Sequence, residues 1–229
     1  MWKYLCYYNF LYICIVAKKI ENVSIILKIV MFFLNGVLLV TLFSCSNSQK
    51  GRPNIPVETL KQGDVAFRRG EGVISNIVLY NDADGMYSHV GLIVKHNDSL
   101  KVVHSVPGEH DDENDFDRVK IEPIEDFYSV ERAERGEILR ISMSDMQREN
   151  IAKLALEKAE QKVKFDHDYN LNDTTTLYCT EFVQLMFKNV GIDLAESRIS
   201  DIIFPGMSGN YIMPSDLYKN KNLISIYKY

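Results

Sequence analysis

The chain has 229 residues, of which 46% are hydrophobic and 25% charged, so it is long enough for one globular domain plus a targeting segment but too short for two ordinary domains. The net charge is -5, but the first 45 residues hold four Lys and one Glu, which leaves 22 basic and 30 acidic residues for the rest. An acidic domain without a basic stripe argues against nucleic acid as a partner, because binding to phosphate backbones needs clustered Lys and Arg.

The first 45 residues have the pattern of an export signal. Met31–Phe43 has the length of a signal-peptide hydrophobic region, and the polar run Ser46–Lys50 follows it. The sequence Leu42-Phe43-Ser44-Cys45 between them resembles a bacterial lipobox, in which the cysteine becomes lipid-modified. We therefore expect residues 1–45 to be a signal and lipoprotein segment, with Cys45 lipidated. The alternative is an uncleaved membrane anchor, and either interpretation places the domain in the cell envelope, periplasmic or at the outer membrane.

Residues 46–56 read as a tether, because Pro53 and Pro56 among polar residues resist both helix and sheet. The folded domain is expected over 57–229. His96–Ser99 carries good hairpin-turn chemistry between two strand-like runs. Together with three further short segments these runs predict an antiparallel sheet: Asp64–Arg68, Ser88–Lys95, Lys101–Val106, Val119–Glu122 and Glu137–Ile141.

Two helices are predicted in the second half of the chain. Asp145–Lys164 has helical periodicity, and Ser144 with Gln147 fits a capping box at its start. Cys179–Val190 is the second helix, and it stops at Gly191. Its apolar positions extend well past one face, which indicates a central helix packed against the sheet. The fold class is therefore α+β.

Only one of the four cysteines, Cys179, lies inside the expected domain, so a disulfide framework is not available there. It stands at the start of the second helix, where unpaired amides and the helix dipole favour a thiolate. The same amides can hold the oxyanion of a tetrahedral intermediate. The alternative is an inert, buried small side chain, which is the common state of a lone cysteine.

A base for Cys179 is expected from the hairpin. If the turn centres on Asn97-Asp98, the numbers of facing residues sum to 195, and Gly91 faces His104. His89 and His104 are then diagonal neighbours on one face of the sheet, roughly 7–8 Å apart at Cα. Such a pair suits a base and the group that orients it, although a slip of one residue would separate the two side chains.

Four separated motifs occur in a characteristic order: Gly63–Phe67, Tyr87–Ile93, Val103–Pro107 and Tyr178–Val183. They resemble the circularly permuted NlpC-type, papain-fold cysteine hydrolases of the YiiX/YebB group. The resemblance implies a permuted papain-like fold, an antiparallel sheet packed against a central helix that bears the cysteine. It further implies that Cys179 is the nucleophile, His89 the general base and His104 the third polar residue. Tyr178 or Tyr169 is then a candidate for the oxyanion site or the cleft.

The function expected from this resemblance is an envelope cysteine peptidase or amidase that cleaves an amide, of cell-wall peptides such as peptidoglycan, through a thioacyl-enzyme. A lipid or N-acyl hydrolase or acyltransferase is an alternative, because His104 is similar to the corresponding residue of the lecithin retinol acyltransferase-like branch. A second alternative is a non-catalytic binding lipoprotein. No cofactor is expected. Zinc on His89, His104 and Cys179 is the chemical competitor, but neither a Cys-x-x-Cys nor a His-Glu-x-x-His pattern supports it.

Overall fold

The computed structural model describes residues 53–82, 84–203 and 208–229. The expected signal segment, with Cys45, lies outside these residues. Residues Gly51–Tyr229 form a compact unit, and its described side chains build two hydrophobic clusters, the organisation of a domain that can fold alone. Within the described part of the chain, no helix has the length and apolar character needed to cross a membrane.

A six-stranded antiparallel sheet runs through the molecule in the order β4-β3-β2-β1-β5-β8. Its strands are β1 (Val65–Arg69), β2 (His89–His96), β3 (Ser99–Val106), β4 (Arg118–Pro123), β5 (Arg135–Ile141) and β8 (Leu223–Lys228). A second sheet has two strands, β6 (Ser200–Ile202) and β7 (Gly209–Tyr211). All five strands expected from the sequence are present, and the α+β architecture is confirmed.

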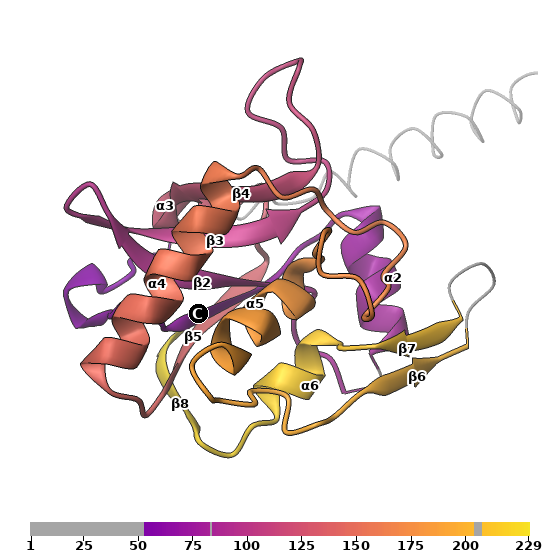
Figure 1. Cartoon of the computed structure of the whole chain (residues 1–229). Helices are drawn as coiled ribbons and strands as arrows, with labels where there is room; N and C mark the ends of the chain where they lie inside the picture. Colours follow the sequence, from indigo (N-terminus) through magenta and orange to yellow (C-terminus); the bar gives the residue numbers. More distant parts are fainter. Residues whose placement is uncertain (1–52, 83, 204–207) are drawn as a thin grey trace, which may run out of the picture. The chain divides into compact units, whose positions relative to one another are not determined.

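The helices cover the sheet unequally. Figure 1 shows α4 (Asp145–Glu160) and α5 (Cys179–Lys188) lying across one face, and α5 packs against β2 and β3. The larger hydrophobic cluster fills this layer. A smaller cluster on other residues of the same strands packs with α3 (Ile124–Phe127). The remaining helical elements are η1 (Val57–Thr59), α2 (Val73–Asn81) and α6 (Pro214–Tyr218).

The β2–β3 hairpin has the register expected from its turn. Asn97 and Asp98 both have positive φ, 49° and 59°, which matches the tight turn that twisted strands favour. Leu92 pairs with Val103, so the numbers of facing residues sum to 195. A Cβ added to Gly91 would lie 3.1 Å from the Cβ of His104, which shows that the two backbones face each other closely. The hairpin therefore brings His89 and His104 onto one face.

The helix ends differ from the expected ones. α4 stops at Glu160 instead of Lys164, because Lys162 takes a left-handed conformation with φ 49° and the amide of Val163 donates back to the carbonyl of Lys158. The chain then pairs with the beginning of β4 at Lys164. α5 ends at Lys188, and Gly191 follows with φ 80°.

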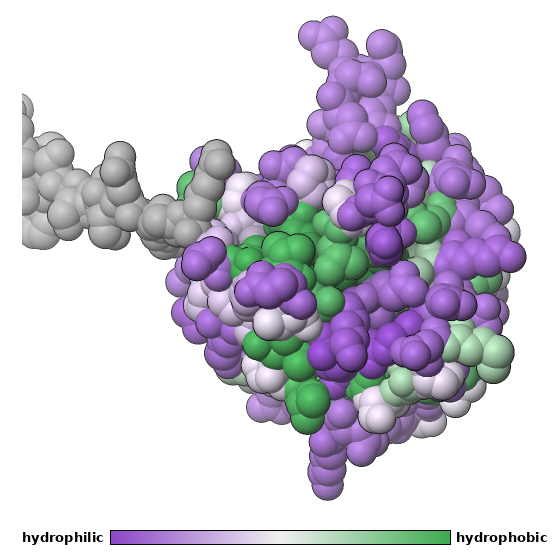
Figure 2. Space-filling view, turned by 90° about the vertical axis from the view of Figure 1, so that its left-hand side faces the viewer, coloured by the Kyte–Doolittle hydropathy of each residue, from purple (hydrophilic) through white to green (hydrophobic). Residues whose placement is uncertain are grey.

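The loop between β3 and β4 carries an acidic run. Glu109–Asp117 holds six carboxylates in nine residues, and most of its side chains are exposed. The loop projects from the top of the molecule in Figure 1, and in Figure 2 the same projection is hydrophilic. Arg118 and Lys120 on β4 pair with Asp111 and Asp115 in it, so part of the negative charge is neutralised locally.

Candidate active site

Cys179 is the first residue of α5 and is half-buried with a free thiol. Hydrogen bonds from two directions fix this helix end. The hydroxyl of Ser105 on β3 donates to the carbonyl of Leu177 at 2.5 Å, and the hydroxyl of Thr180 donates to the carbonyl of Ile212 at 2.5 Å. The start of α5 is therefore held between the sheet and the segment before α6, and the position of the thiol is set by both.

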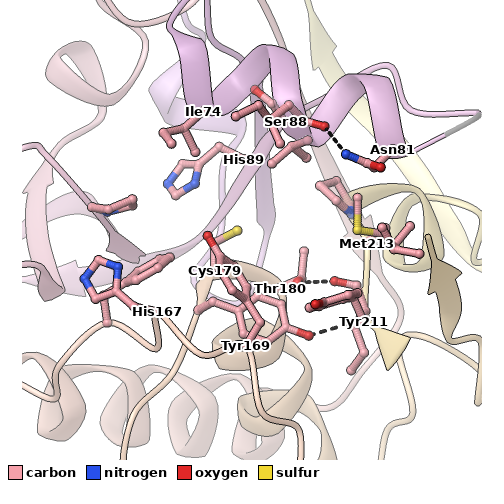
Figure 3. Close-up of a pocket in the computed structure, with 18 of the residues that line it drawn as sticks. Ile74, Asn81, Ser88, His89, His167, Tyr169, Cys179, Thr180, Tyr211 and Met213 are labelled. Atoms are coloured by element: carbon pink, nitrogen blue, oxygen red, sulfur yellow. Dashed lines mark hydrogen bonds between the residues drawn. The ribbon is translucent and has the colours of Figure 1, made fainter. Parts of the chain in front are cut away.

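Cys179 and His89 line the same cavity, which has a volume of about 340 Å³. Figure 3 shows the His89 ring above the Cys179 sulfur, with both side chains directed into the pocket. The rest of the wall is mainly apolar and includes Ile74, Ile77, Val78, Phe165, Tyr169, Ile202, Tyr211, Ile212 and Met213. The pocket thus combines two groups capable of acyl chemistry with a lining suited to a hydrophobic ligand.

Three side chains form a line that ends at this pocket. His89 Nε2 lies 2.8 Å from His104 Nδ1, and His104 Nε2 lies 2.9 Å from Glu122 Oε1, although this second contact departs from the line of an ideal hydrogen bond. His104 is fully buried, and His89 and Glu122 are 8% and 5% exposed. β2, β3 and β4 are adjacent strands, so the sheet itself carries the line.

The charge states along this line follow from its surroundings. Burial alone would raise the pKa of Glu122, but contacts with His104, Arg68 and Arg132 lower it to about 2, so the carboxyl is ionised. Burial, with Arg68 nearby, holds the pKa of His89 well below its usual range. Burial also lowers the pKa of His104, although Glu122 opposes this shift. At neutral pH both imidazoles are therefore neutral.

These charge states determine where the protons lie. An ionised carboxylate only accepts hydrogen bonds, so the proton of neutral His104 is on Nε2, which faces Glu122. The lone pair of His104 is then on Nδ1 and accepts the Nε2 proton of His89. His89 keeps its own lone pair on Nδ1, so the three residues leave the base as the tautomer that can take a proton at the pocket.

Two arginines neutralise the acidic end of the line. Arg68 lies 4.5 Å from the ring centroid of Phe127 and forms an ion pair with Glu109, while Arg132 contacts Glu122 at 2.6 Å and Glu109 at 3.2 Å. Arg68 also lies 3.9 Å from Glu122. The two carboxylates and the two guanidinium groups balance in charge, which keeps Glu122 ionised in a buried position.

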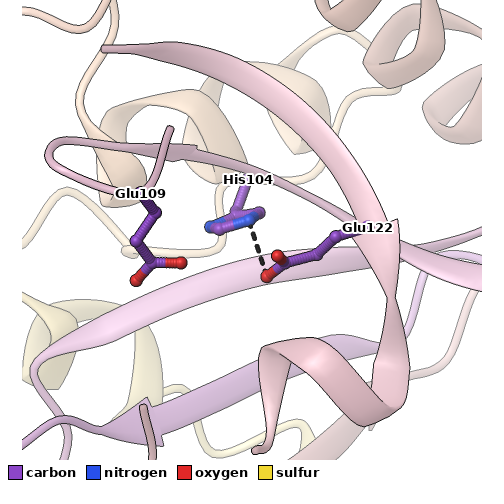
Figure 4. Close-up of side chains that lie close together, drawn as sticks. All are labelled: His104, Glu109 and Glu122. Atoms are coloured by element: carbon purple, nitrogen blue, oxygen red, sulfur yellow. Dashed lines mark ion pairs between the residues drawn. The ribbon is translucent and has the colours of Figure 1, made fainter. Parts of the chain in front are cut away.

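His104, Glu109 and Glu122 offer ligand atoms within 4.8 Å of one another, and Figure 4 shows them converging. Both carboxylates are already engaged by Arg68 and Arg132, however. A divalent cation would have to displace guanidinium groups and remove the Nε2 proton of His104. The donor set therefore fits the ion pairs better than a metal. The zinc set considered from the sequence is not within ligand reach among the described residues.

The pKa of Cys179 differs from the sequence-based expectation. Burial raises the pKa of the thiol to about 11, outweighing the backbone amides of Val90, Thr180 and Cys179 itself and the charge of Arg68, which lower it. The expected lowering by the helix start exists, but it is the smaller effect. In the free enzyme the thiol is protonated beside a neutral imidazole.

Tyr178 and Tyr169 both line the pocket. The Tyr178 hydroxyl accepts a hydrogen bond of 3.0 Å from the amide of Ile212, and its ring centroid lies 5.3 Å from that of Tyr169. Tyr169 has a left-handed backbone with φ 52°, and burial, with Cys179 nearby, raises its pKa to about 12. Both tyrosines therefore sit beside Cys179 as neutral hydroxyls.

Glu122 and Arg68 are the site residues that the sequence interpretation missed. Glu122 was assigned to a strand, but its function depends on the β3–β4 register, in which His104 pairs with Lys120. Glu122 is thus two residues beyond the partner of His104, the same diagonal relation that joins His104 to His89. A search for a polar residue diagonal to His104 on the next strand could have identified Glu122. The long loop between β3 and β4, however, leaves the register of these two strands undetermined from the sequence.

Comparisons with known proteins agree with this geometry. Residues 59–226 match the model of a family described as permuted papain-like amidase enzyme, YaeF/YiiX, C92 family. Among solved structures, the chain is similar to the metalloprotein YiiX from Escherichia coli O157:H7, with a TM-score of 0.61, 18% sequence identity, and coverage of 75% of this chain and 98% of that one. At this identity the likeness shows the fold alone. No curated protein matches the chain.

Proposed function

Because the chain belongs to the permuted papain-like amidases of the YaeF/YiiX family, whose members are amide-cleaving hydrolases, we propose that Cys179 cleaves its substrate in the cell envelope through a thioacyl-enzyme. The observation that carries this proposal is the line Glu122–His104–His89, which ends at the pocket containing Cys179. It supplies a neutral base in a fixed tautomer beside a thiol. A general-base reaction needs both in one pocket.

In the first half of the reaction, the Cys179 sulfur attacks the amide carbonyl while its proton moves to Nδ1 of His89. The C–S bond forms, and the carbonyl becomes an oxyanion. The imidazolium of His89 then donates this proton to the amine nitrogen as the C–N bond breaks. In the second half, water attacks the thioester and gives one proton to His89, and the carboxylic acid leaves as the thiol is restored. Glu122, held behind His104, stabilises the imidazolium in both halves.

Proton transfer during attack agrees with the raised pKa of Cys179, because a preformed thiolate is not required. The amides of Cys179 and Thr180 at the start of α5 already point at the sulfur and lower its pKa. We assign these amides to the oxyanion, with Tyr178 and Tyr169 as neighbours that shape the cleft.

Two classes of substrate are candidates, and they are supported on different grounds. Cell-wall peptide amides are the first candidate, on the grounds of the amidase family and of the export and lipid anchoring expected for residues 1–45. N-acyl amides are the second candidate, and the apolar wall around the thiol favours them, because Ile74, Ile77 and Val78 contribute hydrophobic contacts that a polar peptide cannot use.

The test uses the unit 51–229 with two probes, a purified cell-wall peptide and an N-dodecanoyl amide. We expect product from at least one probe and, after rapid acid quenching, an intact mass increased by the acyl group on Cys179. Cys179→Ala should form no adduct and no product. His89→Ala should slow adduct formation by about 10²–10⁴-fold, the range of general-base catalysis.

His167 provides the matched control, since it is a second histidine on the pocket wall, paired with Asp117 at 3.0 Å. His167→Ala should keep the rate within a few-fold of the parent. Equal losses in the two histidine variants, or an adduct that persists in Cys179→Ala, would contradict the assignment.

A further inference from the structure

α2 has two apolar faces, although none of its residues is buried. One face lines the pocket, through positions spaced as a single helix side: Ile74, Ile77, Val78 and Asn81. The adjoining face carries Val73 and Tyr80, which are seven residues apart and therefore aligned, and which are 76% and 81% exposed. A short helix that is hydrophobic both toward the pocket and toward solvent leaves apolar area without protein cover.

The other side of the pocket mouth has the same character. Ile202 of β6 lines the pocket, and its neighbour Ile203 is 88% exposed. Ile199, just before β6, is 55% exposed. Figure 1 shows α2 beside β6 and β7, and Ile74 of α2 and Ile202 of β6 line the same pocket. Exposed large hydrophobic side chains thus occur on both of the segments that line the pocket, α2 and β6 with its flanking residues.

The segment around α2 offers no cation to hold an anionic partner. Residues 70–82 contain Glu71 and Asp82 but neither Lys nor Arg, and the whole chain after residue 45 is acidic. The cations nearest to the exposed side chains are already paired, Arg198 with Glu196 and Arg132 with Glu109 and Glu122, so we expect contact with this surface to come mainly from apolar burial. A polybasic membrane-binding patch works by the opposite principle, attraction to anionic headgroups.

We propose that the outer face of α2, together with Ile199 and Ile203, docks on the surface of a lipid bilayer and opens the pocket toward it. The short connection expected between Cys45 and the domain favours a bilayer over other partners. The eleven residues 46–56 extend to at most about 40 Å, so a lipid-anchored domain stays next to its membrane.

This inference goes beyond the proposed reaction. The choice of a bilayer as partner rests on the lipid anchoring expected at Cys45, and the purpose of docking rests on the second substrate candidate. An acyl chain that leaves a bilayer at α2 would pass directly between Ile74 and Ile202 to Cys179, without crossing water. Docking itself does not depend on catalysis. The two proposals can therefore fail separately.

The test measures co-flotation of the unit 51–229 with phosphatidylcholine vesicles and with vesicles that contain 30% phosphatidylglycerol, where that fraction is roughly the anionic content that reveals basic patches. We expect binding to both, unchanged or weaker on the anionic vesicles, and insensitive to added salt on the phosphatidylcholine vesicles. Val73→Ser/Ile203→Ser should weaken partitioning by about tenfold or more, because both side chains enter the bilayer interface.

The matched control is Met146→Ser/Ile224→Ser, which removes two exposed apolar side chains of 69% and 60% exposure from α4 and β8, away from the pocket. It should bind like the parent, and thermal melting should show both double variants to be folded. Cys179→Ala should also bind like the parent, whether or not the enzyme proposal holds.

Three results would overturn the docking proposal. One is absence of flotation with either vesicle. Another is equal loss of binding in the two double variants. The third is a concentration-dependent dimer in sedimentation that Val73→Ser/Ile203→Ser abolishes while vesicle binding is absent, which would show that the surface pairs two copies of the chain.

Discussion

The two sides of the Cys179 pocket differ in polarity and in burial. On the side of β2, β3 and β4, the line His89–His104–Glu122 is buried, and the carboxylate at its end is held by Arg68 and Arg132. On the side of α2, the wall is made of apolar side chains on a helix without a buried residue. The polar side is therefore part of the central sheet, and the apolar side is a helix at the protein surface.

The contrast separates two tasks. The polar side fixes where one proton lies, which requires rigid elements and complete pairing of buried charges. The apolar side accepts a hydrophobic group by area and shape, which a peripheral helix can do. Substitutions on the first side should therefore change the rate of the chemical step, while those on the second should change the affinity for one class of substrate.

Among substitutions that leave Cys179 and His89 in place, the largest expected effect is that of Glu122→Gln, which removes the charge behind His104. We expect kcat to fall by about 100-fold, with KM nearly unchanged, because the imidazolium of His89 loses its stabilising partner only during the reaction. Steady-state kinetics on the better probe measures it. Glu109→Gln is the control, since Glu109 pairs with Arg68 and Arg132 and should cost less than tenfold. Similar losses of kcat in the two variants would mean that the activity depends on the overall charge balance of the cluster and not on the line Glu122–His104–His89.

The pH profile gives the next largest effect. His89 has a lowered pKa, so its neutral form persists below pH 6.5, and the acid limb of kcat/KM should begin below that value. Beyond it the rate should fall about tenfold per pH unit as the base is protonated. Because burial raises the pKa of Cys179 to about 11, alkylation of the thiol in the free enzyme should accelerate only in the alkaline range. Rapid alkylation at neutral pH would show instead a preformed thiolate pair.

The smallest effect should come from the apolar wall. Ile77→Ser should raise KM for an N-dodecanoyl amide by about three- to tenfold, the value of one partly buried aliphatic side chain, and leave an N-acetyl amide unaffected. Comparing the two acyl lengths in one variant makes each substrate the control for the other. Equal changes with both substrates would place the acyl chain elsewhere.

Local sequence patterns predicted much of the fold. The strand segments, the capping box at Ser144 and the turn at Asn97-Asp98 are short-range features, and the structure has each of them. α2 and β8 were missed, although Ile74, Ile77, Val78 and Asn81 have helical spacing. Neither element is deeply buried. Their sequences therefore lack the clear alternation of apolar and polar positions that marks a core helix or strand.

The sequence by itself determined the hairpin register and the position of Cys179 at a helix start, because both depend on residues close together in the chain. Only the tertiary structure decided that Glu122 and Arg68 complete the site, since the pairing of β4 after a long loop brings Glu122 to His104, and the pairing of β1 with β2 places Arg68 opposite His89. It also decided the protonation state of the thiol. The helix start is a local effect and favours the thiolate, whereas burial comes from the whole fold around Cys179 and is the stronger of the two.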